Sequence, residues 1–90
     1  MTILNIPKLK NIFSALANEK RLKVIELCFG KERSVTELSK LLNLNYSITV
    51  EYTSILAKAG LVEKIRNKDG TVRVKSLIRL DNEGEIERLD

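Results

Sequence analysis

The fold is decided by residues 34–45, which read SVTELSKLLNLN. Ser34 followed three residues later by Glu37 is a capping box, in which the serine hydroxyl and the glutamate side chain each satisfy an unpaired backbone N–H. A three-residue turn follows, and Asn45 at its end is suited to cap another helix. The stretch therefore predicts a helix through residue 42, a turn and a second helix, and the buried stripe of the first helix is expected to be Val35, Leu38, Leu41 and Leu42.

A helix and then a hairpin are expected after this turn. The helix is predicted over residues 46–59. Residues 61–66 and 71–77 are rich in β-branched residues in approximate alternation, and Asp69 and Gly70 between them are expected to supply the positive φ values of a hairpin turn. A helix-turn-helix followed directly by a β-hairpin is a winged helix-turn-helix.

Two more helices are predicted ahead of residue 34. The first spans residues 8–17, with Pro7 just before it. Asn18 is expected to cap the second, over residues 19–29, whose buried face is predicted to hold Leu22, Ile25 and Phe29. The fold class is therefore α+β and mostly helical, with about four helices and an antiparallel hairpin.

Ninety residues with 43% hydrophobic composition fit one domain, residues 1–90. Residues 1–7 are expected to form an N-terminal arm, and residues 81–90 an acidic C-terminal tail. Residues 1–80 carry 15 Lys and Arg against 7 Asp and Glu, so the folded part has a net charge of +8. This balance favours a polyanionic partner such as nucleic acid. A turn is expected at residues 81–84, and the final six residues, 85–90, can pair back as a short strand, form a frayed helical turn or stay mobile.

The composition excludes several functional classes. A single cysteine, Cys28, rules out an internal disulfide framework, and the absence of histidine removes the commonest metal ligand and acid/base group. We therefore expect no metal, no cofactor and no enzyme activity. No apolar run has the length of a membrane span, so we also expect a cytoplasmic protein without a membrane partner.

The candidate DNA-binding residues come from the second motif helix, its cap and the basic hairpin. The helix has no Lys or Arg before residue 58, so serine hydroxyls and a valine would read base edges, while the hairpin cations would attract the backbone or minor groove. The hairpin cations have an alternative role in protecting an exposed sheet edge. The predicted set is Lys40, Asn45, Tyr46, Ser47, Val50, Ser54, Lys58, Lys64, Arg66, Lys68, Arg73 and Lys75.

Three phrases of the sequence resemble the ArsR-type, arsenical-repressor-like winged-helix regulators. They are FSALANEKRLKVIEL at 13–27, SVTELSKLLNLN at 34–45 and ILAKAGLV at 55–62. The resemblance implies the winged fold and DNA binding. Metal-sensing relatives carry a cysteine pair in the helix before the recognition helix, but here that region is SVTEL at 34–38, so metal sensing is not expected.

The rotation of the helix at 46–59 is left open between two alternatives. Periodicity places Ile48, Tyr52, Ile55 and Ala59 inside. The resemblance instead implies that positions 49, 53 and 56 are buried. Both rotations expose Tyr46, Ser47, Val50 and Ser54.

The apolar N-terminal arm is expected to pair two copies of the chain, because it has no obvious place in the core of a monomer. In the resembling family the first helix helps to pair the subunits. The predicted dimer interface is Ile3, Leu4, Ile6, Leu9 and Ile12.

We therefore expect a transcriptional regulator, a dimeric repressor that binds duplex DNA sequence-dependently through helix 46–59 and a wing at 61–77. The alternative is a winged-helix module whose helix 46–59 contacts another protein.

Overall fold

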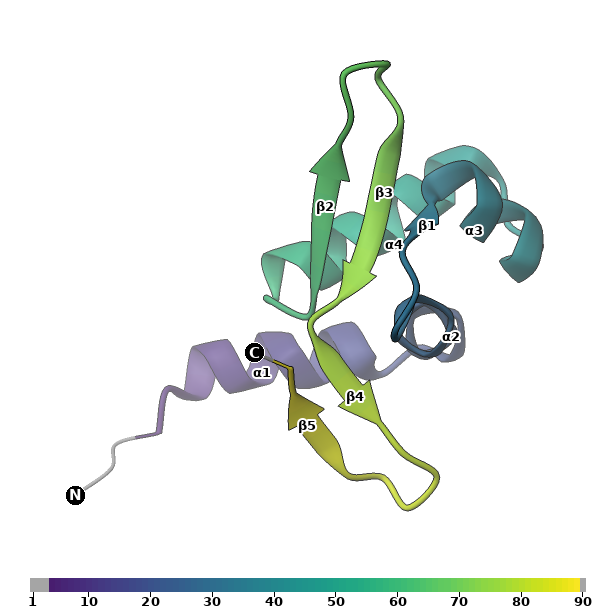
Figure 1. The fold of residues 1–90 in the computed structure, drawn as a ribbon. Helices are drawn as coiled ribbons and strands as arrows, with labels where there is room; N and C mark the ends of the chain where they lie inside the picture. The colour runs from purple at the N-terminus through teal and green to yellow at the C-terminus, as the bar shows by residue number, and fades with distance from the viewer. Residues whose placement is uncertain (1–3, 90) are drawn as a thin grey trace.

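The computed structural model describes residues 4–89 and confirms the winged helix-turn-helix expected from the sequence. In Figure 1 the hairpin β2–β3 projects from the helical body, and a second hairpin, β4–β5, extends from the other end. The elements are α1 (Ile6–Leu16), α2 (Glu19–Cys28), β1 (Arg33–Ser34), α3 (Val35–Leu42), α4 (Tyr46–Lys58), β2 (Val62–Arg66), β3 (Val72–Ser76), β4 (Ile78–Leu80) and β5 (Ile86–Arg88).

Side-chain caps set where the helices begin. The Asn18 side-chain oxygen accepts hydrogen bonds from Lys20 N and Arg21 N at 2.9 and 3.1 Å, as predicted for the start of α2. The prediction for α1 is wrong by two residues: Asn5 caps it, and Pro7 lies inside the first turn rather than ahead of it. A proline fits there because the first helical N–H groups have no partner within the helix. The N-terminal arm is correspondingly shorter than residues 1–7.

The capping box at the start of α3 is only half formed. Ser34 Oγ accepts a hydrogen bond from Glu37 N at 3.0 Å. The Glu37 carboxylate does not complete the box, since it pairs with Arg33 Nη1 at 2.8 Å. Asn43 ends the helix at φ 55°, a left-handed conformation that asparagine tolerates, and this turns the chain into α4. The predicted burial of Leu41 is wrong, because its side chain is 52% exposed.

The core decides the rotation of α4 in favour of the alternative that the family resemblance implied. Thr49, Thr53 and Leu56 are fully buried, whereas Ile48 and Ile55 are only partly buried. The threonine hydroxyls are accommodated because they donate along the helix, from Thr49 to Asn45 O at 2.9 Å and from Thr53 to Thr49 O at 2.9 Å.

The buried face of α2 also differs from the prediction. Val24, Ile25 and Cys28 are fully buried. Leu22 and Phe29 are exposed, because the helix turns the side carrying Val24 and Cys28 toward α3, α4 and the sheet.

The wing is part of a three-stranded antiparallel sheet in the order β1–β3–β2. The sequence did not predict β1, whose Ser34 lies opposite Arg73 of β3. The wing turn relies on Gly70 alone for a positive φ, 87°, so the expectation of a positive φ at Asp69 is wrong. Asp69 instead accepts a hydrogen bond from Thr71 N at 2.9 Å, which an aspartate in a turn commonly does.

The acidic tail pairs back as a strand. β5 pairs with β4 in antiparallel register, with Leu80 opposite Ile86. The loop between them is held by the Asp81 carboxylate, which accepts hydrogen bonds from Glu83 N and Glu85 N. The tail therefore lies at the end of the molecule opposite to the wing tip, away from the basic hairpin (Figure 1).

Candidate nucleic-acid interface

The outward face of α4 is a polar stripe with little net charge. Residues that lie three, four and seven positions apart share one face of a helix, so Ser47, Glu51, Ser54 and Lys58 form one line on the side opposite to the buried Thr49, Thr53 and Leu56. Ser47, Glu51 and Lys58 are exposed and Ser54 is half-buried. Two of the four, Ser47 and Ser54, carry hydroxyl groups that could contact base edges. The only basic residue of the helix lies in its last turn.

The predicted residues at the start of α4 lie beside the wing. Tyr46 is 53% exposed and lines a hollow of about 260 Å³ together with the first residues of α3 and the wing loop, among them Gly70 and Thr71. Val50 is half-buried. The Asn45 side-chain oxygen accepts a hydrogen bond from Ile48 N at 2.8 Å, so this residue caps the helix.

Lys64 and Ser54, both predicted to bind DNA, form a hydrogen bond with each other. Lys64 Nζ of β2 lies 2.7 Å from Ser54 Oγ and 3.4 Å from the carbonyl oxygen of Val50. Burial lowers the pKa of the Lys64 ammonium, and the neighbouring charge of Arg66 lowers it further. The ammonium is thus held against α4 rather than extended into solvent, and it ties the wing to the helix.

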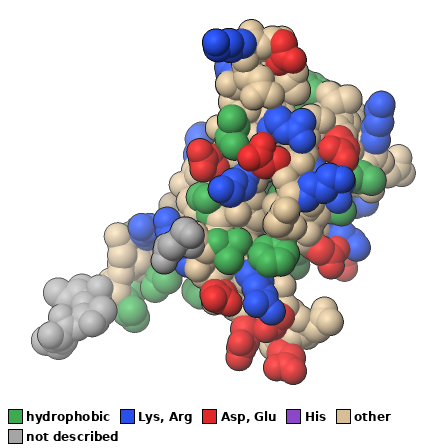
Figure 2. Space-filling model, viewed as in Figure 1, with side chains coloured by type: hydrophobic (Ala, Val, Ile, Leu, Met, Phe, Trp, Pro, Cys, Tyr) green, Lys and Arg blue, Asp and Glu red, His purple; other side chains and the backbone are tan. Residues whose placement is uncertain are grey.

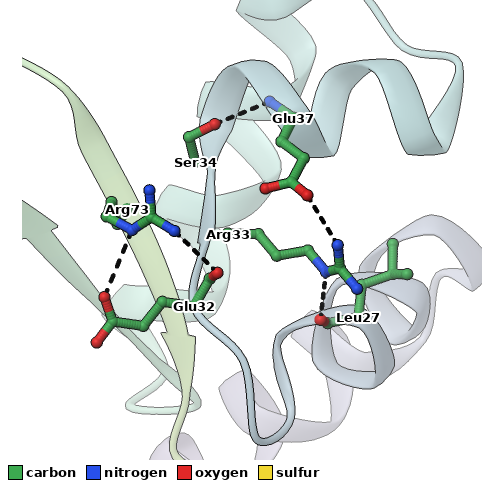
Figure 3. A network of polar contacts seen from close by, with 6 residues as sticks. All are labelled: Leu27, Glu32, Arg33, Ser34, Glu37 and Arg73. Atoms are coloured by element: carbon green, nitrogen blue, oxygen red, sulfur yellow. Dashed lines mark hydrogen bonds and ion pairs between the residues drawn. The ribbon is translucent and has the colours of Figure 1, made fainter.

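Arg73 and Lys75 lie on the face of the sheet that points away from α4. Arg73 pairs with the Glu32 carboxylate at 3.5 Å and donates to the Glu32 carbonyl oxygen at 3.1 Å, contacts shown in Figure 3. Lys75 is exposed and lies opposite Glu63 in the strand register. The positive charge of Arg73 is partly committed to the link between β3 and the loop before β1.

The remaining predicted cations lie at the wing tip and along the motif helices. Arg66 and Lys68 are exposed at the end of β2 and in the wing loop. Lys40 is exposed in the last turn of α3. Figure 2 shows basic and acidic side chains mixed over the sheet face, with acidic side chains gathered at the β4–β5 end. The wing tip is thus the part of the hairpin where cations extend farthest from internal partners.

Two arginines that the predicted set omits hold the motif in place. Arg33 Nε donates to Leu27 O at 2.6 Å while its Nη1 contacts Glu37, so it joins the end of α2 to the start of α3 (Figure 3). Arg21 donates to Ala15 O at 2.6 Å, and its guanidinium lies 5.1 Å from the centre of the Tyr52 ring. The signal for Arg21 is its place one turn after a helix break, where a guanidinium can reach the last carbonyls of the preceding helix.

Four of the predicted dimer residues lie on α1 or just ahead of it, and two of them are exposed. Leu4 and Ile6 are 67% and 66% exposed, and Leu9 and Ile12 are half-buried. Ile3 lies outside the described residues. The sequence missed the continuation of this surface, because Phe13 of α1, Leu22 of α2 and Ile86 of β5 are also exposed. These three residues line one open groove of about 760 Å³.

Cys28 is a core residue in this structure. Its side chain is fully buried, and burial raises the pKa of the thiol to about 11. The thiol is therefore protonated at neutral pH, which argues against a redox switch at this position.

Within residues 4–89, no group of three or more His, Cys, Asp or Glu side chains is placed to hold a metal ion. Among the helices of the same residues, none has the length and apolar character needed to cross a membrane.

The chain resembles known proteins in both sequence and fold. The profile of the family described as bacterial regulatory protein, arsR family, matches residues 18–64. Among solved structures, reduced HlyU from Vibrio cholerae is 32% identical with a TM-score of 0.70, over 80% of this chain and 75% of that chain. NolR from Sinorhizobium fredii is 26% identical with a TM-score of 0.71, over 84% of this chain and 81% of that one.

A third structure, the homodimeric winged helix-turn-helix DNA-binding domain of a possible ArsR-family transcriptional regulator from Mycobacterium bovis, has a TM-score of 0.73. It is 24% identical over 79% of this chain and 65% of that one, and so supports the fold alone. Comparison with curated protein sequences gave no match. The family profile covers more than half of the chain and includes α2, α3, α4 and the start of the wing. The chain belongs to the arsR family of bacterial regulatory proteins.

Proposed function

We propose that this regulator is a cytoplasmic, dimeric repressor that binds duplex DNA with sequence preference, with α4 in the major groove and the wing tip on the backbone or minor groove. The observation that carries the proposal is the polar stripe of α4 beside the exposed cations Arg66 and Lys68 of the wing. A neutral helix can read shape and base edges, while neighbouring cations supply the attraction to phosphate.

A titration of DNA affinity against salt tests this proposal directly. Each phosphate that the protein neutralises contributes about −0.9 to the slope of log K against log salt on duplex DNA. A protein that uses the wing cations should therefore show a slope of several units. A chain that ignores duplex DNA even in dilute buffer would overturn the proposal.

The dimer is proposed to form through α1 and the groove next to it. Leu4, Ile6 and Phe13 are each at least 60% exposed, and large apolar side chains gathered on one surface mark contact sites. A two-fold dimer presents its recognition helices about 34 Å apart, one turn of DNA. Sedimentation of the chain should give twice the monomer mass, and a high-affinity duplex selected from random sequences should have two-fold symmetry.

A second candidate function is a winged-helix module that binds another protein. Exposed Tyr46 and half-buried Val50, on a helix that has no lysine or arginine before its last turn, favour it. The same salt titration separates the two candidates, because a protein-binding module has little affinity for duplex DNA.

A further inference from the structure

The outward face of α4 receives a positive charge from outside the helix. Before its last turn, α4 carries no lysine or arginine, and Glu51 stands in the middle of its exposed stripe. Lys64 of β2 places its ammonium 2.7 Å from Ser54 Oγ and 3.4 Å from the carbonyl oxygen of Val50. The hairpin therefore delivers a cation to the recognition helix at the level of its third turn.

The direction of this hydrogen bond determines what the two side chains can offer a ligand. An ammonium only donates, so Ser54 Oγ must be the acceptor from Lys64. Within residues 4–89 no acceptor bonds the Ser54 hydroxyl hydrogen, and the ammonium uses only two of its three hydrogens on the protein. Ser54 and Lys64 together therefore present two donors side by side.

Glu51 adds an acceptor to the same face. It lies three residues before Ser54, so the two side chains are neighbours on one side of the helix. The carboxylate is exposed, and an ionised carboxylate only accepts hydrogen bonds. The stripe thus combines two donors with one adjacent acceptor.

This pattern matches one kind of base pair. In the major groove guanine shows two acceptors, N7 and O6, and its cytosine shows one donor, the N4 amino group. An A·T pair shows acceptor, donor and acceptor across the groove, which would place a donor of adenine against a donor of the protein. We propose that Ser54, Lys64 and Glu51 together read a G·C base pair, with Ser54 and Lys64 donating to guanine and Glu51 accepting from cytosine; this rests on the proposed function.

The position of Lys64 supports this role. Its ammonium is partly buried between the sheet and α4 and has already lost some of its hydration in the free protein, which is also why its pKa is lowered. A donor that is held in place by protein contacts costs less to immobilise on a base edge than a freely rotating surface lysine.

Modified bases in a duplex selected from random sequences test the proposal. Replacing each guanine in turn with 7-deazaguanine removes the N7 acceptor, whereas inosine keeps both N7 and O6. For the wild-type protein, 7-deaza replacement of one guanine per half-site should lower the affinity for the duplex about tenfold. Inosine replacement of the same guanine should not cause a loss of that size.

Three variants then assign that effect to side chains. Ser54→Ala and Lys64→Met each remove one of the two donors, and the variant that loses the donor to N7 should bring the 7-deaza penalty at that guanine to within about twofold. The other variant should weaken the preference for G·C at that pair. Alanine is the better helix former, so the fold of Ser54→Ala should persist. Glu51→Ala should raise affinity for random duplexes and reduce the preference for G·C at the same pair. Lys31→Met removes one charge from an exposed loop residue and should leave the base preference unchanged.

The outcomes separate this proposal from the proposed function. If the wild-type protein binds no duplex at low salt, the proposed function fails. If it binds a preferred site, but the penalty at every guanine survives in Ser54→Ala and Lys64→Met, only the G·C reader is overturned. A uniform loss of affinity in Lys64→Met with unchanged base preference makes Lys64 a phosphate contact and also overturns the reader.

Discussion

The two hairpins of this chain have the same turn and different surroundings. In the wing, Gly70 N donates to Asn67 O at 3.1 Å, and in the terminal hairpin Gly84 N donates to Asp81 O at 3.1 Å. Both glycines have a positive φ. The wing is joined to α4 through Lys64 and to β1 through Arg73, whereas every side chain of β5 is exposed.

Charge makes the second difference. The wing loop and the end of β2 carry Arg66 and Lys68 against Asp69, while residues 81–90 hold five acidic residues and one arginine. Turns of the same kind therefore join hairpins of opposite charge. We interpret the anchored, basic hairpin as the nucleic-acid arm and the acidic one, beside the α1 groove, as part of the pairing surface.

The largest difference between the two regions should be in stability. Leu56 is fully buried where α4 meets the sheet, so Leu56→Ala should lower the free energy of unfolding by about 2–5 kcal/mol, through lost burial and the cavity left behind. Ile86 of β5 is 50% exposed, and Ile86→Ala should cost less than about 1 kcal/mol in the monomer. Urea denaturation of both variants measures the contrast, and equal losses would show that the terminal hairpin shares the core.

Charge reversal in the wing should lower the affinity for DNA, whereas charge reversal in the terminal hairpin should not. The double variant Arg66→Glu with Lys68→Glu should weaken binding to every duplex alike and reduce the size of the salt slope by about 2, because two phosphate contacts are lost. The matched pair Arg79→Glu with Arg88→Glu removes two cations from the terminal hairpin. We expect its salt slope to stay unchanged, and a similar loss in both pairs would mean that binding depends on net charge alone.

The glycines provide a smaller and more local contrast. Gly70→Ala and Gly84→Ala both force a positive φ on a residue with a Cβ. This backbone strain should cost about 1–2 kcal/mol of stability in each turn. No steric clash adds to it, because the added carbon has open space in both turns. Only Gly70→Ala should also weaken DNA binding. Thermal melts and affinities on one duplex check this, and a loss of binding in Gly84→Ala would contradict the assignment of the two arms.

The smallest effect concerns pH in the wing loop. The hydrogen bond from the Thr71 backbone lowers the pKa of Asp69 below its usual value. A lowered pKa means that the ionised carboxylate stabilises the turn above the ordinary pKa near 3.8 and that this support is lost as the pH falls through the lower, folded value. The Thr71 amide proton signal in NMR should follow this titration, and in Asp69→Asn it should not.

Local chemistry in the sequence determined much of this protein. The start of α2, the turn at Asn43–Asn45, the cap of α4 and the wing strands follow from interactions within a few residues, such as caps and turn propensities. These signals were enough to predict the winged helix-turn-helix, whereas the family was inferred from the resemblance of the segments at 13–27, 34–45 and 55–62.

The tertiary structure decided what depends on distant neighbours. Thr49 and Thr53 are buried because α4 presents them to the core and their hydroxyls donate to carbonyl oxygens of the same chain segment. The periodicity of apolar residues alone favours a different buried face of this helix. β1 exists only because β3 pairs with it. The contact between Lys64 and Ser54 joins residues ten positions apart on different elements, and packing of the hairpin against α4, rather than any local preference, brings them together.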